Sequence, residues 1–236
     1  MRGALALAGV LALAGPATAV PSSLSALVLP PSVVLTKYAA ALVLVKEPLA
    51  FSFEYALDQS GVHNLSSQHR VYRSGTTERD ETIAINGQRT RRPEVRIFRN
   101  RPNRYALAKI APSEDAYIFT PAGSIVSGKH RDYSFRLTPY KPQAFRVDRI
   151  VIDGVTFLPR SLSYTMHVGA NVGTGTLVFG KSDKYWMIGT ATASVGDSRE
   201  KIAWSSYRFI NAMPRETFAE PKPVPSVVVP LAPGGL

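Results

Sequence analysis

The chain has 236 residues, of which 45% are hydrophobic and 19% charged, a composition that excludes an intrinsically disordered protein. It contains no cysteine, which excludes disulfides, thiolate metal ligands, a cysteine nucleophile and a lipid-modified cysteine. The formal net charge of +11 favours an anionic partner such as a lipid headgroup or a polyanion.

The first segment of the chain is typical of a secretory signal peptide. Arg2 supplies a positive charge, residues 4–15 form an apolar run, and Ala17-Thr18-Ala19 matches a small-residue cleavage site. We therefore expect residues 1–19 to be removed on export, residues 20–31 to form a lead-in, and the mature protein to be periplasmic or secreted. The apolar run is shorter than the ~20 residues that a spanning helix needs, so no stable membrane span is expected.

One helix is expected near the start of the mature chain, over residues 33–46. Ser32 can cap its first turn and Pro48 ends it. Apolar side chains recur at helical spacing and define one buried face. This face consists of Val34, Tyr38, Ala41, Leu42 and Val45.

Residues 49–57 give the clearest strand pattern. Large apolar side chains at every second position, from Leu49 to Leu57, alternate with small or polar ones. One face of this strand is therefore buried. The sequence leaves open whether that face is an ordinary core face or the wall of a cavity.

Further strands and turns follow along the rest of the chain. Asn86-Gly87 and Asp153-Gly154 indicate hairpins, and residues 121–123, 180–183 and 196–198 indicate turns. The expected strands cover residues 68–75, 81–85, 94–98, 104–109, 116–120, 145–152, 162–168, 172–179, 185–194 and 201–209.

The sequence thus predicts a mainly β protein, with a curled antiparallel sheet or unclosed β-barrel of about ten strands and the N-terminal helix as a lid. This domain is expected to cover residues 32–218. Residues 219–236 contain many prolines and are expected to be a disordered tail.

Arginines concentrate between residues 89 and 104, opposed only by Glu94. They could be solvated strand edges, whose charge discourages edge-to-edge aggregation. They could contact an anionic lipid or an acidic protein. Nucleic acid is a third possibility, with Tyr72 and Tyr105 as stacking partners, but export disfavours it and no nucleic acid is expected. The arginines proposed to contact an anionic partner are Arg89, Arg91, Arg92, Arg96, Arg99 and Arg104.

The segment Arg101-Pro102-Asn103-Arg104-Tyr105, followed by Pro112, resembles the periplasmic lipoprotein-carrier (LolA-like) superfamily. A helix followed by an aromatic-rich strand agrees with that family, whereas Ala122-Gly123 stands where the family has Asp-Gly. Glu78-Arg79 together with Asn86-Gly87 resembles the related RseB-like regulators of envelope stress.

The resemblance implies a half-barrel whose apolar interior takes acyl chains, with an acyl chain, a lipoprotein or an anionic lipid as partner and no cofactor. It also implies that Arg101 ties the lid closed, although an arginine here could equally be a solvated residue at a strand start. The candidate lining residues are Phe51, Phe53, Tyr55, Ile83, Ile85, Tyr164, Met166 and Trp186.

No convincing catalytic or metal-binding pattern is present. The four histidines, His63, His69, His130 and His167, are not spaced as metal ligands. Ser198 and Lys201 satisfy an S-x-x-K pattern without its helical context. Asp148 and Asp153 have no identifiable acid partner.

The principal hypothesis is therefore an exported lipid- or lipoprotein-binding carrier that performs no chemistry and is not an enzyme. The alternative is an envelope-stress or sensor-type protein-interaction module on the same scaffold. A hydrolase with an unrecognised site is a third option.

Overall fold

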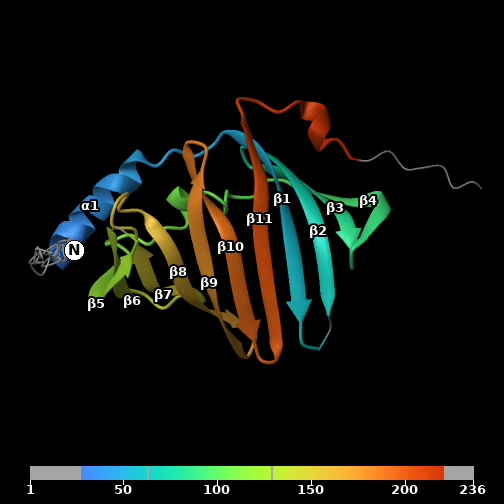
Figure 1. Ribbon diagram of the computed structural model, residues 1–236. Helices are drawn as coiled ribbons and strands as arrows, with labels where there is room; N and C mark the ends of the chain where they lie inside the picture. Colours follow the sequence, from blue (N-terminus) through green and yellow to red (C-terminus); the bar gives the residue numbers. More distant parts are fainter. Residues whose placement is uncertain (1–27, 63, 129, 221–236) are drawn as a thin grey trace, which may run out of the picture.

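A computed structural model describes residues 28–62, 64–128 and 130–220, so the expected signal peptide and nearly all of the proline-rich tail lie outside the described residues. Eleven strands form one antiparallel sheet in the order β4-β3-β2-β1-β11-β10-β9-β8-β7-β6-β5. The predicted mainly β fold, a curled sheet that does not close into a barrel, with one N-terminal helix, is confirmed (Figure 1).

The elements follow the chain in a simple order. They are α1 (Pro31–Leu44), β1 (Ala50–Ser60), β2 (Leu65–Ser74), β3 (Thr77–Ile85), β4 (Gln88–Phe98), the 3₁₀ helix η1 (Leu107–Lys109), β5 (Tyr117–Ser127), β6 (His130–Pro139), β7 (Phe145–Ile152), β8 (Pro159–Val168), β9 (Asn171–Ser182), β10 (Tyr185–Val195), β11 (Ser198–Ile210) and the 3₁₀ helix η2 (Arg215–Phe218). Within the described ranges, no helix is long and apolar enough to cross a membrane.

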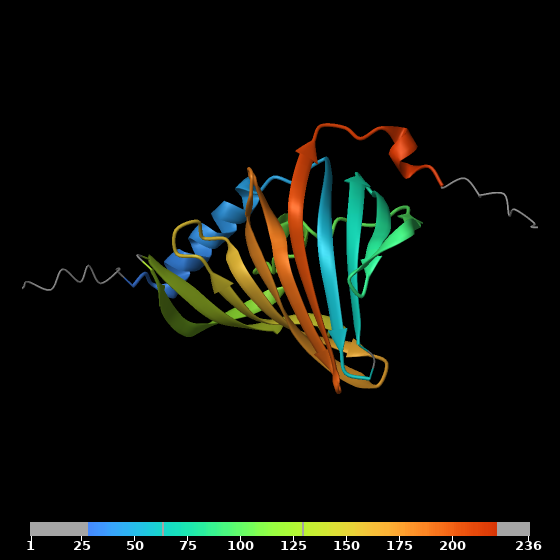
Figure 2. The same cartoon turned by 45° about the vertical axis from the view of Figure 1, so that its right-hand side comes forward.

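The strand order places the consecutive strands β4 and β5 at opposite edges of the sheet. Across a flat sheet of eleven strands these edges would be roughly 48 Å apart, at about 4.8 Å per strand. The sheet is instead strongly curled, and residues 99–116 connect the two edges across its inner side (Figures 1 and 2). We call residues 99–116 the crossover segment.

The crossover segment packs directly on the inner face of the sheet. Tyr105, Ala106 and Leu107 are all buried. Ala106 forms an isolated bridge with Met187 of β10, and the backbone N–H of Ile188 donates to the carbonyl of Tyr105 at 3.1 Å. The middle of the crossover segment is therefore part of the core.

The prediction of a strand over residues 104–109 is wrong. The side-chain oxygen of Asn103 accepts hydrogen bonds from the backbone N–H groups of Tyr105, at 3.0 Å, and Ala106, at 3.4 Å. Such an Asx-type turn bends the backbone away from an extended ladder, and residues 107–109 continue as the 3₁₀ helix η1.

Helix α1 begins earlier than expected. Pro30 is its N-cap and makes no side-chain hydrogen bond, so the prediction of Ser32 as N-cap is wrong. Pro31 occupies the first turn, where its fixed φ suits the helix and its missing N–H costs nothing. The expected buried face is confirmed at Val34 and Tyr38, whereas Ala41, Leu42 and Val45 are only half-buried and Val45 follows the last residue of the helix.

The helix covers the β5–β8 end of the sheet, as both ribbon views show. The Tyr38 hydroxyl donates to the carbonyl of Pro112 in the crossover segment, and the Tyr38 ring packs against Phe119 of β5 with centroids 5.9 Å apart. Lys37 lies over the ring of Phe157 at 4.8 Å. The helix is thus attached to the crossover segment as well as to the sheet.

The region from residue 121 to residue 139 departs most from expectation. Residues 121–123 were expected to form a turn but lie inside β5, where the register shifts between Pro121 and Gly123, and Gly123 has a φ of 109°. An edge strand tolerates proline, and a bulge tolerates glycine, so a turn-like sequence can continue as a strand. No strand was expected at β6, whose Phe135 and Leu137 are buried.

Several turns and strands are confirmed. Asn86 and Gly87 have φ values of 49° and 79° and connect β3 to β4 in a tight hairpin. The bounds of β7 agree with the expected strand over residues 145–152. The Asp153-Gly154 turn belongs to a longer loop, residues 153–158, between the paired strands β7 and β8.

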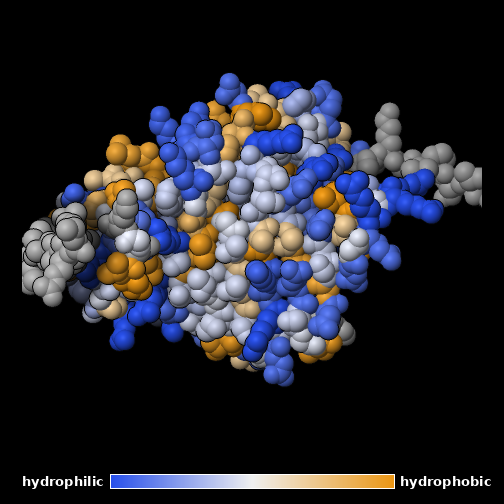
Figure 3. All heavy atoms as spheres, viewed as in Figure 1, coloured by the Kyte–Doolittle hydropathy of each residue, from blue (hydrophilic) through white to orange (hydrophobic). Residues whose placement is uncertain are grey.

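Aromatic side chains fill the interior at the Ala50 end of β1. Phe51 and Phe53 are each 1% exposed, and the ring of Phe53 lies 4.7 Å from Tyr105 and 5.4 Å from Tyr207. Burying one such ring stabilises a fold by about 1.5–3 kcal/mol. The outer face seen in Figure 3 is largely hydrophilic, with hydrophobic residues in separate patches.

Replacing Tyr38 with Phe should loosen α1. The substitution removes the hydroxyl that pairs the buried carbonyl of Pro112, a loss of about 1–3 kcal/mol. Hydrogen exchange of residues 31–44 should accelerate while the exchange of β1 stays unchanged. Thr36→Ala, which removes an exposed hydroxyl bond to Ser32 on the same helix, serves as the control. Equal protection of α1 in both variants would contradict this role for Tyr38.

Candidate functional site

An apolar pocket of about 380 Å³ lies between the inner face of the sheet and the crossover segment. Paired positions such as Tyr55 with Trp204, and Ala191 with Leu177, present their side chains to it from neighbouring strands. We call it the inner pocket. It is lined by Tyr55, Leu57, Arg104, Tyr105, Ile110, Phe145, Leu177, Ile188, Ala191, Ile202 and Trp204.

A larger pocket of about 970 Å³, which we call the mouth, adjoins the inner pocket. The two share Arg104, Ile110 and Phe145 in their linings. The mouth also includes the linker before β1, at Glu47 and Leu49, and the stretch of crossover segment around η1. Both volumes fall within the roughly 300–1,000 Å³ that is usual for ligand pockets.

The candidate lining residues occupy different places. Tyr55 lines the inner pocket. Phe51 and Phe53, on the same face of β1, are packed in the aromatic core beside it. Trp186 is half-buried against the core and donates to the carbonyl of Pro159 at 3.0 Å.

The other four candidates lie farther away. Tyr164 and Met166 line a separate pocket of about 440 Å³ near the Ser60 end of β1. Ile83 lies where the register of β3 shifts, and Ile85 is 41% exposed at the end of that strand. None of these four is among the residues that line the inner pocket.

Several lining residues were missed. Leu177, Ile202 and Trp204 lie within strands that were expected, and the alternation in β9 and β11 could have identified them. Ile188 and Ala191 are separated by a bulge in β10, which breaks the two-residue period and hides their common face.

A buried carboxylate fixes the start of the crossover segment. Glu78 of β3 is 0% exposed and pairs with Arg73 at 2.9 Å and with Arg101 at 2.8 Å. Arg104 lies 4.0 Å from it, and the Tyr105 hydroxyl donates to it at 3.1 Å. Burial, and then the negative charge of Glu78, raise the pKa of the Tyr105 hydroxyl to about 12.

Arg101 makes contacts with β3, with β4 and with the turn that precedes β3. It bonds Glu78, its guanidinium lies 4.2 Å from the centroid of the Phe98 ring, and its backbone N–H donates to the carbonyl of Thr76. No recorded contact within the described ranges joins Arg101 to α1. Arg101 is therefore connected to α1 through the crossover segment. Glu78 holds the start of this segment at Arg101, and Tyr38 of α1 donates a hydrogen bond to its Pro112 carbonyl.

A second anchor holds the crossover segment to the linker between α1 and β1. The side-chain amide of Asn103 donates to Glu47 at 2.7 Å, and Lys109 lies 3.5 Å from the same carboxylate. Asn103 is 8% exposed. The Arg-Pro-Asn sequence therefore supplies two separate attachments, an ion pair from Arg101 and a polar anchor at Asn103, and the ring of Pro102 fixes the φ angle between them.

The arginine cluster divides into an outer and an inner group. Arg89, Arg91, Arg92 and Arg96 lie on β4, an edge strand, and their side chains are exposed, as is that of Arg99 just after it. Arg96 pairs with Glu94 at 2.7 Å. Arg104 is separate from this edge and lines both the inner pocket and the mouth.

A polar network crosses the inner face of β1, β2 and β3. The Tyr55 hydroxyl donates to Asp80 at 2.9 Å, and His69 lies between Asp80 and Ser67 with both contacts at 3.0 Å. The His69 and Tyr55 rings stack at 4.4 Å, which fixes the orientation of Tyr55. Burial, and then the charge of Asp80, raise the pKa of Tyr55.

The order Ser67-His69-Asp80 is that of a hydrolase relay. Ser67 is only 5% exposed, and it lines neither the inner pocket nor the mouth. The hydroxyl of Ser67 is therefore buried outside both of these pockets. The network allows these polar side chains to satisfy one another's hydrogen bonds beside an apolar pocket.

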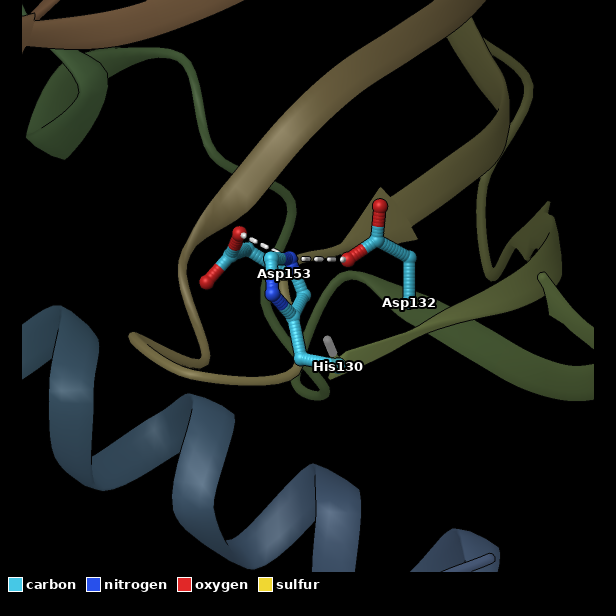
Figure 4. Close-up of side chains that lie close together, drawn as sticks. All are labelled: His130, Asp132 and Asp153. Carbon is cyan, nitrogen blue, oxygen red and sulfur yellow. Dashed lines mark ion pairs between the residues drawn. The ribbon is translucent and has the colours of Figure 1, made fainter. Parts of the chain in front are cut away.

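A further cluster, which the sequence spacing did not reveal, lies near α1. Figure 4 shows His130 between the carboxylates of Asp132 and Asp153, each 3.6 Å from its Nε2. The guanidinium of Arg160 pairs with the same two carboxylates, at 3.2 and 2.8 Å. The guanidinium therefore offsets one of the two negative charges of these carboxylates.

Asp153 also organises its own loop. One of its oxygens accepts hydrogen bonds from the backbone N–H groups of Val155, at 3.0 Å, and Thr156, at 2.7 Å. Burial acts to raise the pKa of Asp153, but these bonds and Arg160 outweigh it and lower the pKa below its ordinary value. The cluster therefore holds the loop that carries Phe157 beneath Lys37 of α1.

Neither the protein-family models nor the curated proteins compared with this sequence give a match. Similar solved structures include a LolA superfamily protein from Nitrosomonas europaea, with 11% identity and a TM-score of 0.45 over 82% of this chain and 99% of that one. A DUF1329 family protein from Desulfovibrio piger has 14% identity and a TM-score of 0.46 over 79% of this chain and 97% of that one.

A Pseudomonas aeruginosa complex of MucA and MucB gives 11% identity and a TM-score of 0.24 over 77% of this chain and 99% of the matched chain. A LolA superfamily protein and a MucA–MucB complex are thus among the solved structures similar to this chain, each with a TM-score below 0.5. At these identities the likeness is one of fold.

Replacing Glu78 with Gln should destabilise the fold strongly. The amide cannot neutralise Arg73, which is 1% exposed, and breaking a buried pair in this way costs about 3–5 kcal/mol. Urea unfolding should report the loss. Glu94→Gln removes the exposed carboxylate that pairs with Arg96 and should change the midpoint little. Equal midpoints in the two variants would contradict a structural role for the buried carboxylate.

Proposed function

We propose that this chain is an exported lipid- or lipoprotein-binding carrier that holds an acyl chain in the inner pocket and performs no chemistry. The observation that carries the proposal is a pocket of about 380 Å³ on the inner face of the sheet whose lining is mostly aliphatic and aromatic. The protein's own side chains fill the Ala50 end of the interior and leave this part open.

The magnitude of the hydrophobic effect explains why such a pocket suits an acyl chain. Burial stabilises about 0.8 kcal/mol per methylene, so a 16-carbon chain costs on the order of 12 kcal/mol to hold in water. Side chains such as Leu57, Leu177 and Ile202 offer an apolar alternative. The mouth gives the polar end of the ligand a route to solvent.

The proposed route of release involves α1 and the crossover segment. The crossover segment closes one side of the inner pocket through Arg104, Tyr105 and Ile110. Because Tyr38 joins α1 to Pro112, a movement of the helix would displace the same segment. In this proposal Arg101 gates the pocket by fixing the start of the crossover segment on Glu78.

Localisation outside the cytoplasm is part of the same proposal. It is supported by the signal-peptide pattern of residues 1–19. In an extracytoplasmic compartment, a carrier of this kind would take an acyl chain, a lipoprotein or an anionic lipid as its partner.

Filling the inner pocket should abolish binding without unfolding the protein. Ala191→Phe adds a ring at a lining position of β10, and we expect the Kd for a fluorescent fatty-acid analogue to rise at least about tenfold, a loss of about 1.4 kcal/mol or more. Ala203→Phe adds the same ring to the outer face of β11, between Ile202 and Trp204, and should leave the Kd within about twofold.

Circular dichroism should confirm that both Phe variants remain folded. The proposal fails if natively purified protein contains no extractable lipid and the wild-type chain does not bind the analogue. Equal binding by wild type and Ala191→Phe would locate the acyl chain elsewhere.

A second candidate function is a protein-interaction module, and the exposed arginines of β4 favour it. The edge strand presents Arg89, Arg91 and Arg92 with no acidic neighbour until Glu94. Such an edge could dock an acidic protein segment, and the attraction would weaken as salt screens it.

Reversing charge on this edge should abolish capture of an acidic partner. With Arg91→Glu and Arg92→Glu combined, we expect proteins retained from envelope extract at low salt to be lost, as they are for wild type in about 1 M salt. Lys181→Glu combined with Lys184→Glu makes the same charge change at the β9–β10 turn and should retain them. Retention that is insensitive to both salt and the β4 reversal would rule out this docking mode.

A further inference from the structure

Positive charge exceeds negative charge where the inner pocket meets the mouth. The single carboxylate of Glu78 faces three guanidinium groups, from Arg73, Arg101 and Arg104. One negative charge cannot neutralise three positive ones, so a local surplus remains. The three groups differ in how their own hydrogen-bonding capacity is used.

The guanidinium groups of Arg73 and Arg101 are already engaged in contacts that stabilise the fold. Arg73 is 1% exposed and donates to Glu78 and to the carbonyl of Arg101. Arg101 donates to Glu78 at 2.8 Å, lies over the ring of Phe98 and is absent from the linings of the inner pocket and the mouth.

Arg104 makes the longest contacts of the three arginines. Its side chain is 57% exposed, its distance to Glu78 is 4.0 Å, and its hydrogen bonds to the Tyr105 hydroxyl are long, at 3.4 and 3.5 Å. It lines both the inner pocket and the mouth. A guanidinium with spare donors thus stands where an apolar pocket opens into a polar one.

Lys109 adds a second cation on the same side. It also lines the mouth, and its side chain is 56% exposed. Its partner Glu47 lies 3.5 Å away and already accepts a shorter hydrogen bond from Asn103, at 2.7 Å. Among the charged residues that line the mouth, Arg73, Arg104 and Lys109 outnumber Glu47.

We propose that the natural ligand is an anionic amphiphile whose carboxylate or phosphate headgroup binds Arg104, assisted by Lys109, while its alkyl chain lies in the inner pocket. This inference rests on the proposed function and adds the chemistry of the headgroup. A guanidinium matches both carboxylate and phosphate with paired hydrogen bonds. A neutral headgroup of the same size would cover these cations without neutralising them, which disfavours its binding.

Calorimetric titration with matched single-chain lipids tests the proposal. The ligands are oleate, lysophosphatidylglycerol with an oleoyl chain, and monoolein, all below their aggregation concentrations. Wild-type protein should bind at least one anionic lipid at least about tenfold more tightly than monoolein. The preference should shrink as salt rises, because the Debye length falls to about 3 Å at 1 M.

Substitutions show which residues cause the preference for anionic over neutral lipids. Arg104→Gln should bring the ratio of the anionic to the neutral Kd close to one while the Kd for monoolein stays within about twofold. Lys109→Gln, at an exposed position, should reduce the ratio in part. Arg96→Gln removes an equally exposed arginine that pairs with Glu94 on β4, and should leave the ratio unchanged.

Each outcome decides a separate point. Tight binding of oleate alone identifies a carboxylate headgroup, and tight binding of the phospholipid alone identifies a phosphate. Equal binding of neutral and anionic lipids by wild type overturns this inference and leaves the acyl-chain carrier standing. A preference that survives in Arg104→Gln overturns the assignment to Arg104. Failure of all three lipids to bind overturns the inference together with the proposed function.

Discussion

The connection between the two edges of the sheet is the constraint on which the rest of the structure depends. Because β4 and β5 are consecutive in the chain but lie at opposite edges, residues 99–116 must connect these edges, and they do so across the inner face. The curl of the sheet brings these edges closer together, and the crossover segment packs on the inner face that the curl creates. The inner pocket is the space that remains between them.

The polar anchors follow from the same constraint. A segment that crosses an apolar face brings backbone and side-chain polar groups into a region without water, and each must find a partner. Glu78 accepts hydrogen bonds from Arg101 and Tyr105. Glu47 accepts one from Asn103, and the carbonyl of Pro112 accepts one from Tyr38. These contacts join β3, the linker before β1 and α1 to a single segment, which couples the helix to the pocket.

The sequence predicted the parts of the fold that have a regular period. The alternation expected from Leu49 to Leu57, the hairpin at Asn86-Gly87 and the bounds of β7 all arise from local patterns, and the structure retains them except at Leu49, which precedes β1 and is 75% exposed. The bulged strand β5 was misjudged, because Pro121 and Gly123 have the composition of a turn, and only the neighbouring strand β6 explains why the chain continues.

The pocket itself was only partly predictable. Phe51, Phe53 and Tyr55 were all expected to line it, but the ring of Tyr105 packs against Phe51 and Phe53, whereas Tyr55 borders the space left open beside them. No local pattern reveals where a distant segment will lie. The clusters around Glu78, Asp80 and Asp153 likewise depend on pairings between residues that are far apart in the chain.

The pairing of β1 with β11 has a consequence for how the chain reaches this state. The first and the last strands are neighbours inside the sheet, paired from Ala50 with Ile210 to Ser60 with Arg199 with a register shift between Ser52 and Glu54. While the chain is being made, β1 can pair with β2, but its other side has no partner until residue 198 and those after it arrive. Until then the aromatic face of β1 and a row of open backbone groups are available for wrong associations, so the nascent protein needs protection until its final strand emerges.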